Sequence, residues 1–161
     1  MKQQGFTFLE LILYIALLSI FLTGAIYFAW DIIYGQVRST VQQEVNENLR
    51  IAVERIQFEI RNAVKINNVG TNFIELDSGL IGPTIISLVE KRIQITQGGE
   101  TNNLTSSNVE VTDLSFTNLT TGDQSSKNIK FSLSLRHKNP GGRKDWAREQ
   151  TFETSVELRS N

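Results

Sequence analysis

One carboxylate interrupts an otherwise apolar stretch near the start of this chain. From Phe6 to Trp30 the sequence is almost entirely apolar, and Glu10 is its only charged side chain. A charge at the centre of a bilayer costs roughly 2.5–3.5 kcal/mol on insertion scales, and such groups usually have a function and a partner. Glu10 lies only about 6 Å from Phe6 along a helix, so a nearby membrane interface would lower that cost. A cation is the partner that such a carboxylate needs.

A second group of side chains that could bind a ligand lies near the C-terminus, around the only histidine of the chain, His137. It consists of Arg136, His137, Lys138, Arg143, Lys144, Trp146 and Arg148. Clustered cations beside an indole could grip phosphate or stack on a base, as in proteins that bind single strands. A charged hairpin tip is more often a solvated tip or a docking surface. We favour these two alternatives over nucleic acid.

The rest of the composition argues against catalysis, metals and cofactors. The chain has no cysteine, which excludes disulfides, thiolate metal sites and thiol nucleophiles. A hydrolase triad at His137 would need a serine in a G-x-S-x-G elbow, and the sequence has no such motif. Glu75 and Asp77 lack the loop spacing of a calcium site. We expect no enzymatic activity, no metal and no cofactor, and the net charge of −1 gives no global field toward nucleic acid.

The apolar stretch itself predicts a membrane-spanning helix. At ~1.5 Å per residue, the helix from Phe6 to Trp30 would be about 37 Å long, enough to cross about 30 Å of hydrocarbon. A secretory signal would have an apolar core of roughly 7–15 residues followed by a small-residue cleavage site. Here the core is longer and no such site follows it. Lys2 is the only charged side chain before the span, which predicts that the leader is cytoplasmic and the rest lies outside.

Residues 5–10 read Gly-Phe-Thr-Phe-Leu-Glu, after a short basic leader and before the long apolar run. This pattern resembles the type IV pilin-like family, which includes the pseudopilins of type II secretion, with Phe8 where leucine is usual. The resemblance implies that a prepilin peptidase cuts after Gly5 and methylates the new amino group of Phe6. It also implies that Glu10 pairs with the Phe6 ammonium of a neighbouring subunit. A plain signal anchor with a tolerated glutamate is the alternative.

Beyond the span, apolar residues at spacings of three and four predict that the helix continues with one apolar face. These residues are Val37, Val41, Val45, Leu49, Ala52, Ile56, Ile60 and Val64. Arg55 and Glu59 are spaced to form an ion pair on this helix. We expect the helix to end around Lys65, with residues 67–70 as the cap.

After Gly70 the apolar period becomes two, which predicts strands. The expected strands are Phe73 to Asp77, Thr84 to Glu90, Arg92 to Gln97, and a hairpin formed by residues 129–136 and 152–159. In residues 109–116 the alternation changes phase, and a bulge near Thr112 and Asp113 would reconcile its two halves. The polar tracts 98–108 and 117–128 are expected to be loops.

Together these patterns predict an α+β fold, in which a long N-terminal helix packs against an antiparallel head of one or two sheets. The expected division is a leader at 1–5, a transmembrane and assembly helix at 6–34, an amphipathic helix at 35–66 and a β-rich head at 67–161. Residues 108–116 and Leu158 with Arg159 look like those of a minor pilin or a J-type minor pseudopilin.

The resemblance implies a structural subunit of a type IV pilus or a secretion pseudopilus. Its expected partners are the prepilin peptidase, other pilin or pseudopilin subunits, the inner-membrane assembly platform and, before assembly, membrane lipid. It would cross the cytoplasmic membrane once, with the head outside, and then enter the filament. Two alternatives remain: a signal-anchored extracytoplasmic binding domain, and a DNA-uptake pilin that uses the basic loop 136–148.

Overall fold

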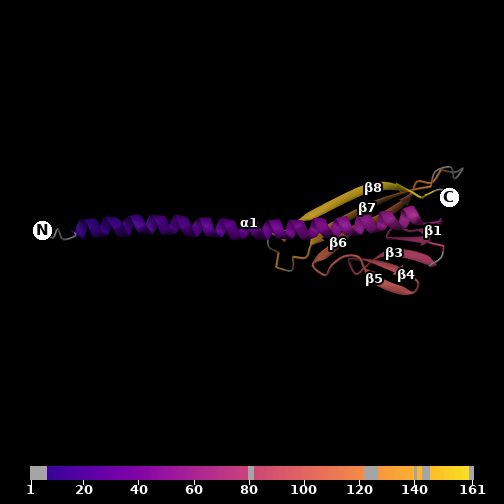
Figure 1. Ribbon diagram of the computed structural model, residues 1–161, viewed down its shortest axis with the longest axis horizontal. Helices are drawn as coiled ribbons and strands as arrows, with labels where there is room; N and C mark the ends of the chain where they lie inside the picture. Colours follow the sequence, from indigo (N-terminus) through magenta and orange to yellow (C-terminus); the bar gives the residue numbers. More distant parts are fainter. Residues whose placement is uncertain (1–6, 80–81, 122–126, 140, 143–145, 160–161) are drawn as a thin grey trace. The chain divides into compact units, whose positions relative to one another are not determined.

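A computed structural model describes residues 7–79, 82–121, 127–139, 141–142 and 146–159. The chain divides into two compact units, Met1–Ser39 and Thr40–Asn161. Its elements are α1 (Phe8–Asn62), β1 (Lys65–Val69), β2 (Phe73–Asp77), β3 (Pro83–Val89), β4 (Arg92–Gln97), β5 (Glu100–Asn103), β6 (Val109–Asn118), β7 (Asn128–His137) and β8 (Glu149–Glu157). This order of one long helix and then antiparallel strands confirms the predicted α+β fold (Figure 1).

The helix ends earlier than predicted, at Asn62 rather than near Lys65. Its last turn tightens, because the Ala63 amide donates to the carbonyl of Ile60 at 3.4 Å, and the Asn62 side chain donates to the carbonyl of Phe58 at 3.0 Å. The Ile60 carbonyl is one of the last four, which a helix end leaves without regular partners. The predicted end was therefore wrong by three residues. Val64, predicted to lie on the apolar face, is 61% exposed beyond the helix.

The segment predicted as a helix cap forms β1 instead. Lys65–Val69 pairs antiparallel with β2, with a bulge between Ile66 and Asn68. Gly70 lies in the hairpin turn, where its amide donates to the carbonyl of Phe73 at 2.9 Å. Without β1, the edge of β2 would expose a row of unpaired backbone groups. Pairing therefore outweighs the loop tendency of the asparagines.

The first sheet is a meander in the order β1-β2-β3-β4-β5. Residues 73–77 and 92–97 are strands with the predicted bounds, and the predicted strand 84–90 lies one residue earlier at both ends, as Pro83–Val89. The prediction of a loop over 98–108 was wrong for β5, whose four polar residues are all exposed. Its pairing with β4 includes a 2.8 Å hydrogen bond between the hydroxyls of Thr96 and Thr101. A polar edge strand has no apolar alternation by which to recognise it.

The second sheet contains β6, β7 and β8, in that order. The predicted hairpin is confirmed, since β7 and β8 pair antiparallel with Leu133 opposite Phe152. The predicted bulge is also confirmed, because the register of β6 against β7 shifts between Val111 and Asp113. The shift buries Val111 and Leu114 on the same face despite their odd spacing.

The core of the head forms where the C-terminal part of α1 packs against both sheets (Figure 1). From the helix it receives Val45, Ala52, Val53, Ile56 and Ile60. The sheets contribute Ile74, Leu76, Ile86, Ile93, Leu114, Ile129, Phe131, Leu133 and Leu135, among others. The predicted apolar face thus supplies the helical side of the core. The predicted pair is present as well, with Arg55 Nη2 2.7 Å from Glu59 Oε1, and Arg55 also donates to Gln97 of β4 at 3.0 Å.

Candidate functional site

The described part of the N-terminal segment begins at Thr7, so Gly5 and Phe6 lie outside it. Thr7 caps α1, because its Oγ1 accepts a hydrogen bond from the Glu10 amide at 3.3 Å. Its carbonyl accepts from the Leu11 amide at 3.2 Å. Threonine is favoured at this position since its hydroxyl satisfies an amide at the helix start that has no partner in the helix. The helix therefore starts at Phe8, two positions after the residue predicted to carry the new amine.

Glu10 lies in the first turn of α1 with its side chain exposed. The hydroxyl of Tyr14, one turn further along, donates a hydrogen bond to Glu10 Oε1 at 3.1 Å. Two further polar side chains of the apolar run satisfy themselves within the helix. Ser19 donates to the carbonyl of Ile15, and Thr23 to that of Ser19, each at 2.8 Å. Glu10 therefore remains the only charged group of the apolar run.

The surface around Glu10 is apolar and uncovered within the chain. Phe8 is 79% exposed and Phe21 is 73% exposed, and the other large apolar side chains of this part of α1 are exposed as well. None of the residues in the most apolar stretch of α1 is buried, and among the described residues this helix is long and apolar enough to cross a membrane. Lipid or other helices can cover such a surface.

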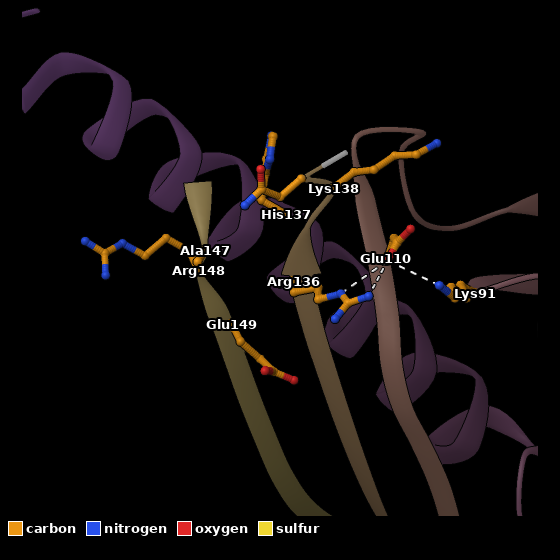
Figure 2. Close-up of a pocket in the computed structure, with 9 residues that line it drawn as sticks. Lys91, Glu110, Arg136, His137, Lys138, Ala147, Arg148 and Glu149 are labelled. Carbon is orange, nitrogen blue, oxygen red and sulfur yellow. Dashed lines mark hydrogen bonds and ion pairs between the residues drawn. The ribbon is translucent and has the colours of Figure 1, made fainter. Parts of the chain in front are cut away.

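The structure brings part of the predicted basic cluster to one pocket of about 470 Å³ at the end of the second sheet (Figure 2). Arg136 and His137 line it from the end of β7, Lys138 follows that strand directly, and Arg148 directly precedes β8. Trp146 packs edge-on against His137, with the ring centroids 5.3 Å apart. Arg143 and Lys144 lie outside the described residues.

Three charged residues of this pocket were missed from the sequence: Lys91, Glu110 and Glu149. Glu110 and Glu149 lie opposite Arg136 on the two neighbouring strands, so the strand register brings these charges together. The alternation of apolar and polar residues in β6 and β7, together with the predicted bulge, could have predicted which residues of the two strands lie opposite each other. The side chain of Lys91 approaches from the turn between β3 and β4, which no local pattern connects to β6.

The basic side chains of the pocket do not converge on one point. Arg136 donates to Glu110 Oε2 through Nε at 3.2 Å and Nη2 at 2.8 Å, and Lys91 Nζ lies 3.5 Å from the same oxygen. In Figure 2 both point toward Glu110, whereas Arg148 points away from them. The hydrogen bonds from Arg136, with the nearby charge of Lys91, lower the pKa of Glu110 against the opposing effect of burial. Two of the four cations therefore already neutralise a carboxylate.

His137 links the head's helix to its second sheet. Its side chain is only 9% exposed, and Nε2 lies 3.2 Å from Glu44 Oε2 on α1. The other Glu44 oxygen accepts from the Asn108 side chain at 2.7 Å. His137 Nδ1 is buried and has no hydrogen-bond partner among the described residues. This environment, nearly buried and with one contact to a carboxylate, fits a packing role within the head.

No group of three or more histidine, aspartate or glutamate side chains in the described ranges is placed to hold a metal ion.

Comparison with known proteins finds a match over the N-terminal segment. The family profile described as the prokaryotic N-terminal methylation motif covers residues 1–26, the segment that contains the predicted cleavage point and Glu10. No curated protein and no solved structure matches the chain. The motif agrees with the apolar, exposed start of α1 that carries a single carboxylate. The N-terminal segment of the chain is therefore similar to that of the type IV pilin-like family, whose methylation motif it matches.

Proposed function

We propose that this chain is the precursor of a structural subunit, a minor pilin of a type IV pilus or a minor pseudopilin of a type II secretion system. The observation that carries the proposal is the methylation motif over residues 1–26, joined to an exposed apolar helix. The chain acts as a substrate of the processing enzyme and as a building block, and not as a catalyst. Its partners are the prepilin peptidase, other pilin or pseudopilin subunits and the assembly platform of the inner membrane.

Processing supplies the cation that the apolar run from Phe6 to Trp30 lacks. Cleavage after Gly5 turns the Phe6 amide into an amine, and methylation leaves that amine a cation at neutral pH. The new charge lies four residues before Glu10, about one helical turn away. A carboxylate in a medium of low dielectric gains most from a fixed cation close to it. The proposed cut therefore completes an ion pair.

Assembly then pairs Glu10 of one subunit with the Phe6 amine of a neighbour. The apolar surface of α1 leaves lipid and packs against the same segment of other subunits. Contacts between two different surfaces of identical or similar chains produce open helices, the symmetry of a filament. In this proposal residues 1–5 are the leader, 6–34 the transmembrane and assembly helix, 35–66 the segment that carries α1 into the head, and 67–161 the rest of the head.

Before assembly, the apolar helix anchors the precursor in the cytoplasmic membrane. The proposal has it cross once, with the head outside the cytoplasm, before it enters the pilus or pseudopilus. Lys2 before the span favours that orientation.

For the basic pocket of the head we propose a separate role, which is the docking of another subunit. Lys138 is exposed, and neither Lys138 nor Arg148 has an ion-pair partner among the described residues. Acidic side chains of a neighbour would complement them. Nucleic acid is a weaker candidate, because Arg136 and Lys91 are already paired with Glu110.

The test of the proposed function is the Glu10→Ala variant. We expect normal insertion into the membrane and a loss of about tenfold or more in filament incorporation, because the neighbouring amine then lacks its partner in a region of low dielectric. Incorporation is measured by immunoblot of sheared filaments and normalised to the membrane pool. The control is Glu47→Ala, which removes an exposed carboxylate from the same helix. Normal incorporation of Glu10→Ala would contradict the proposed pairing.

A further inference from the structure

The carboxylate of Glu10 already has a partner within its own helix. Tyr14 lies four residues further along, and its hydroxyl donates to Glu10 Oε1 at 3.1 Å. Residues four apart lie on the same face of a helix, and helical side chains lean toward the N-terminus. The Tyr14 ring therefore reaches back over the turn that contains Glu10. The contact therefore ties the carboxylate to a side chain that lies C-terminal to it in the sequence.

Two groups at the start of the same helix compete for this carboxylate. In the sequence Thr-x-x-Glu, which residues 7–10 form, the glutamate commonly turns back to the backbone amide of the threonine. Here Thr7 makes its half of this arrangement, accepting from the Glu10 amide at 3.3 Å. The Glu10 side chain instead accepts a hydrogen bond from the Tyr14 hydroxyl. The second competitor is the amine that processing would create at Phe6, one residue before Thr7.

Pairing of Glu10 with its own Phe6 amine would oppose assembly. Both groups belong to one chain, so the pair would form without a neighbour and would satisfy the charges that an incoming subunit has to use. A subunit that joins the filament would then have to break this pair first. Any contact that keeps the carboxylate away from its own N-terminus favours pairing between subunits.

We propose that Tyr14 is a positioning residue, which directs the carboxylate of Glu10 away from the amine of its own chain and toward that of a neighbour. This inference rests on the proposed function. A carboxylate accepts several hydrogen bonds, so the contact with the tyrosine leaves room for an ammonium. A hydrogen bond to a charged group in a medium of low dielectric is also stronger than the same bond in water. The tyrosine hydroxyl therefore stays in place as the ion pair forms.

The test measures the reactivity of the Phe6 amine in the processed full chain, purified in detergent micelles. An amine held as an ammonium by its own carboxylate reacts slowly with a small amine-specific reagent, and mass spectrometry of the N-terminal peptide gives the rate. We expect Tyr14→Phe, which keeps the ring, to slow the reaction by roughly three- to fifteenfold. These factors correspond to the free energies of single hydrogen bonds between side chains within membranes. Tyr27→Phe is the matched control, since it removes a hydroxyl from an exposed side chain of the same helix.

A double-mutant cycle separates positioning from a general effect on the helix. In the Glu10→Ala background, Tyr14→Phe should leave the rate unchanged, because the group on which Tyr14 acts is gone. Two results would overturn the inference: a Tyr14→Phe rate equal to that of the unmodified sequence, or a slowing that persists without Glu10.

Filament incorporation of the same variants distinguishes this inference from the function on which it rests. If Glu10→Ala fails to assemble while Tyr14→Phe labels and assembles normally, the positioning role is lost and the proposed function stands. If Glu10→Ala assembles normally, the proposed ion pair is lost, and the role of Tyr14 with it.

Discussion

Glu10 and Glu110 show how differently one residue type can be used in this chain. Glu110 has its cations within the head, where Arg136 lies 2.8 Å and Lys91 3.5 Å from the same oxygen. Glu10 has no cationic side chain near it in the apolar run. Folding of the head therefore provides the cationic partners of Glu110. In our proposal Glu10 gains a cationic partner only through processing and assembly.

The pairing of Glu110 predicts how the stability of the head depends on pH. Because its pKa in the folded head lies below its ordinary value of 4.5, the ionised form stabilises the head fully above about that pH. This contribution is lost as the pH falls through the lower, folded-state pKa. Glu110→Gln should reduce stability by about 0.5–1 kcal/mol at neutral pH, as is typical of a partly exposed pair. It should also flatten the acid side of the profile.

Thermal unfolding of the detergent-solubilised protein between neutral and acidic pH measures this effect. Glu100→Gln is the control, since it changes an exposed carboxylate on the edge strand β5. An acid profile of Glu110→Gln that follows the unmodified profile would show that the Arg136 pair does not contribute.

At the scale of elements, the packing of α1 on the two sheets should dominate the stability of the head. Ile56 is fully buried in the core, whereas Ile51 on the same helix is 45% exposed. Ile56→Ala should destabilise the head by about 2–5 kcal/mol, since it removes a buried side chain and leaves a cavity. Ile51→Ala should change stability by no more than about 0.5 kcal/mol. Thermal unfolding compares the two, and equal losses would contradict the packing described for α1.

The turn between β3 and β4 contains backbone strain that can be relieved. Glu90 and Lys91 have φ values of 48° and 62°, the left-handed region that a two-residue turn of this kind requires and that asparagine tolerates better. Glu90→Asn should stabilise the head by about 0.5–1 kcal/mol. Lys91→Asn should gain less, because it also removes a cation from Glu110. Unfolding temperatures provide the comparison, and a loss of stability in Glu90→Asn would contradict the strain argument.

Elements with an apolar alternation were predictable from the sequence, and those without it were not. The hairpin of β7 and β8 and the bulge in β6 follow from which side chains must be buried. β1 and β5 were missed because tertiary pairing creates them. β1 covers the edge of β2 with a segment rich in asparagine, and β5 is a wholly exposed edge. Neither of these pairings can be recognised from the residues of β1 or β5 alone.

The candidate sites divide in the same way. Glu10 could be found from composition alone, because a charge within a long apolar run is conspicuous. The basic cluster was found as a run of neighbouring residues, but its electrostatics depend on Glu110 and Lys91, which are distant in sequence. The contact between Tyr14 and Glu10 follows from a spacing of four residues. Only the structure shows that the Tyr14 hydroxyl donates a hydrogen bond to the Glu10 carboxylate.

At the scale of the molecule, the two compact units have opposite surfaces. In the unit at residues 1–39, the described residues from Thr7 onward expose their large apolar side chains, whereas the unit at 40–161 has its own buried core. The apolar surface of the first unit fits an apolar environment, and the second unit buries apolar side chains in a core of its own. Both features fit a subunit that moves from a membrane into a filament.

The measurement that tests the central claim most directly is the intact mass of the protein from cells that contain a prepilin peptidase. Our account predicts a chain that begins at Phe6 and carries one additional methyl group, with the mass of the uncut chain when the peptidase is inactivated. A chain that still begins at Met1 in the presence of the active enzyme would contradict it, because the cation that Glu10 requires would never form.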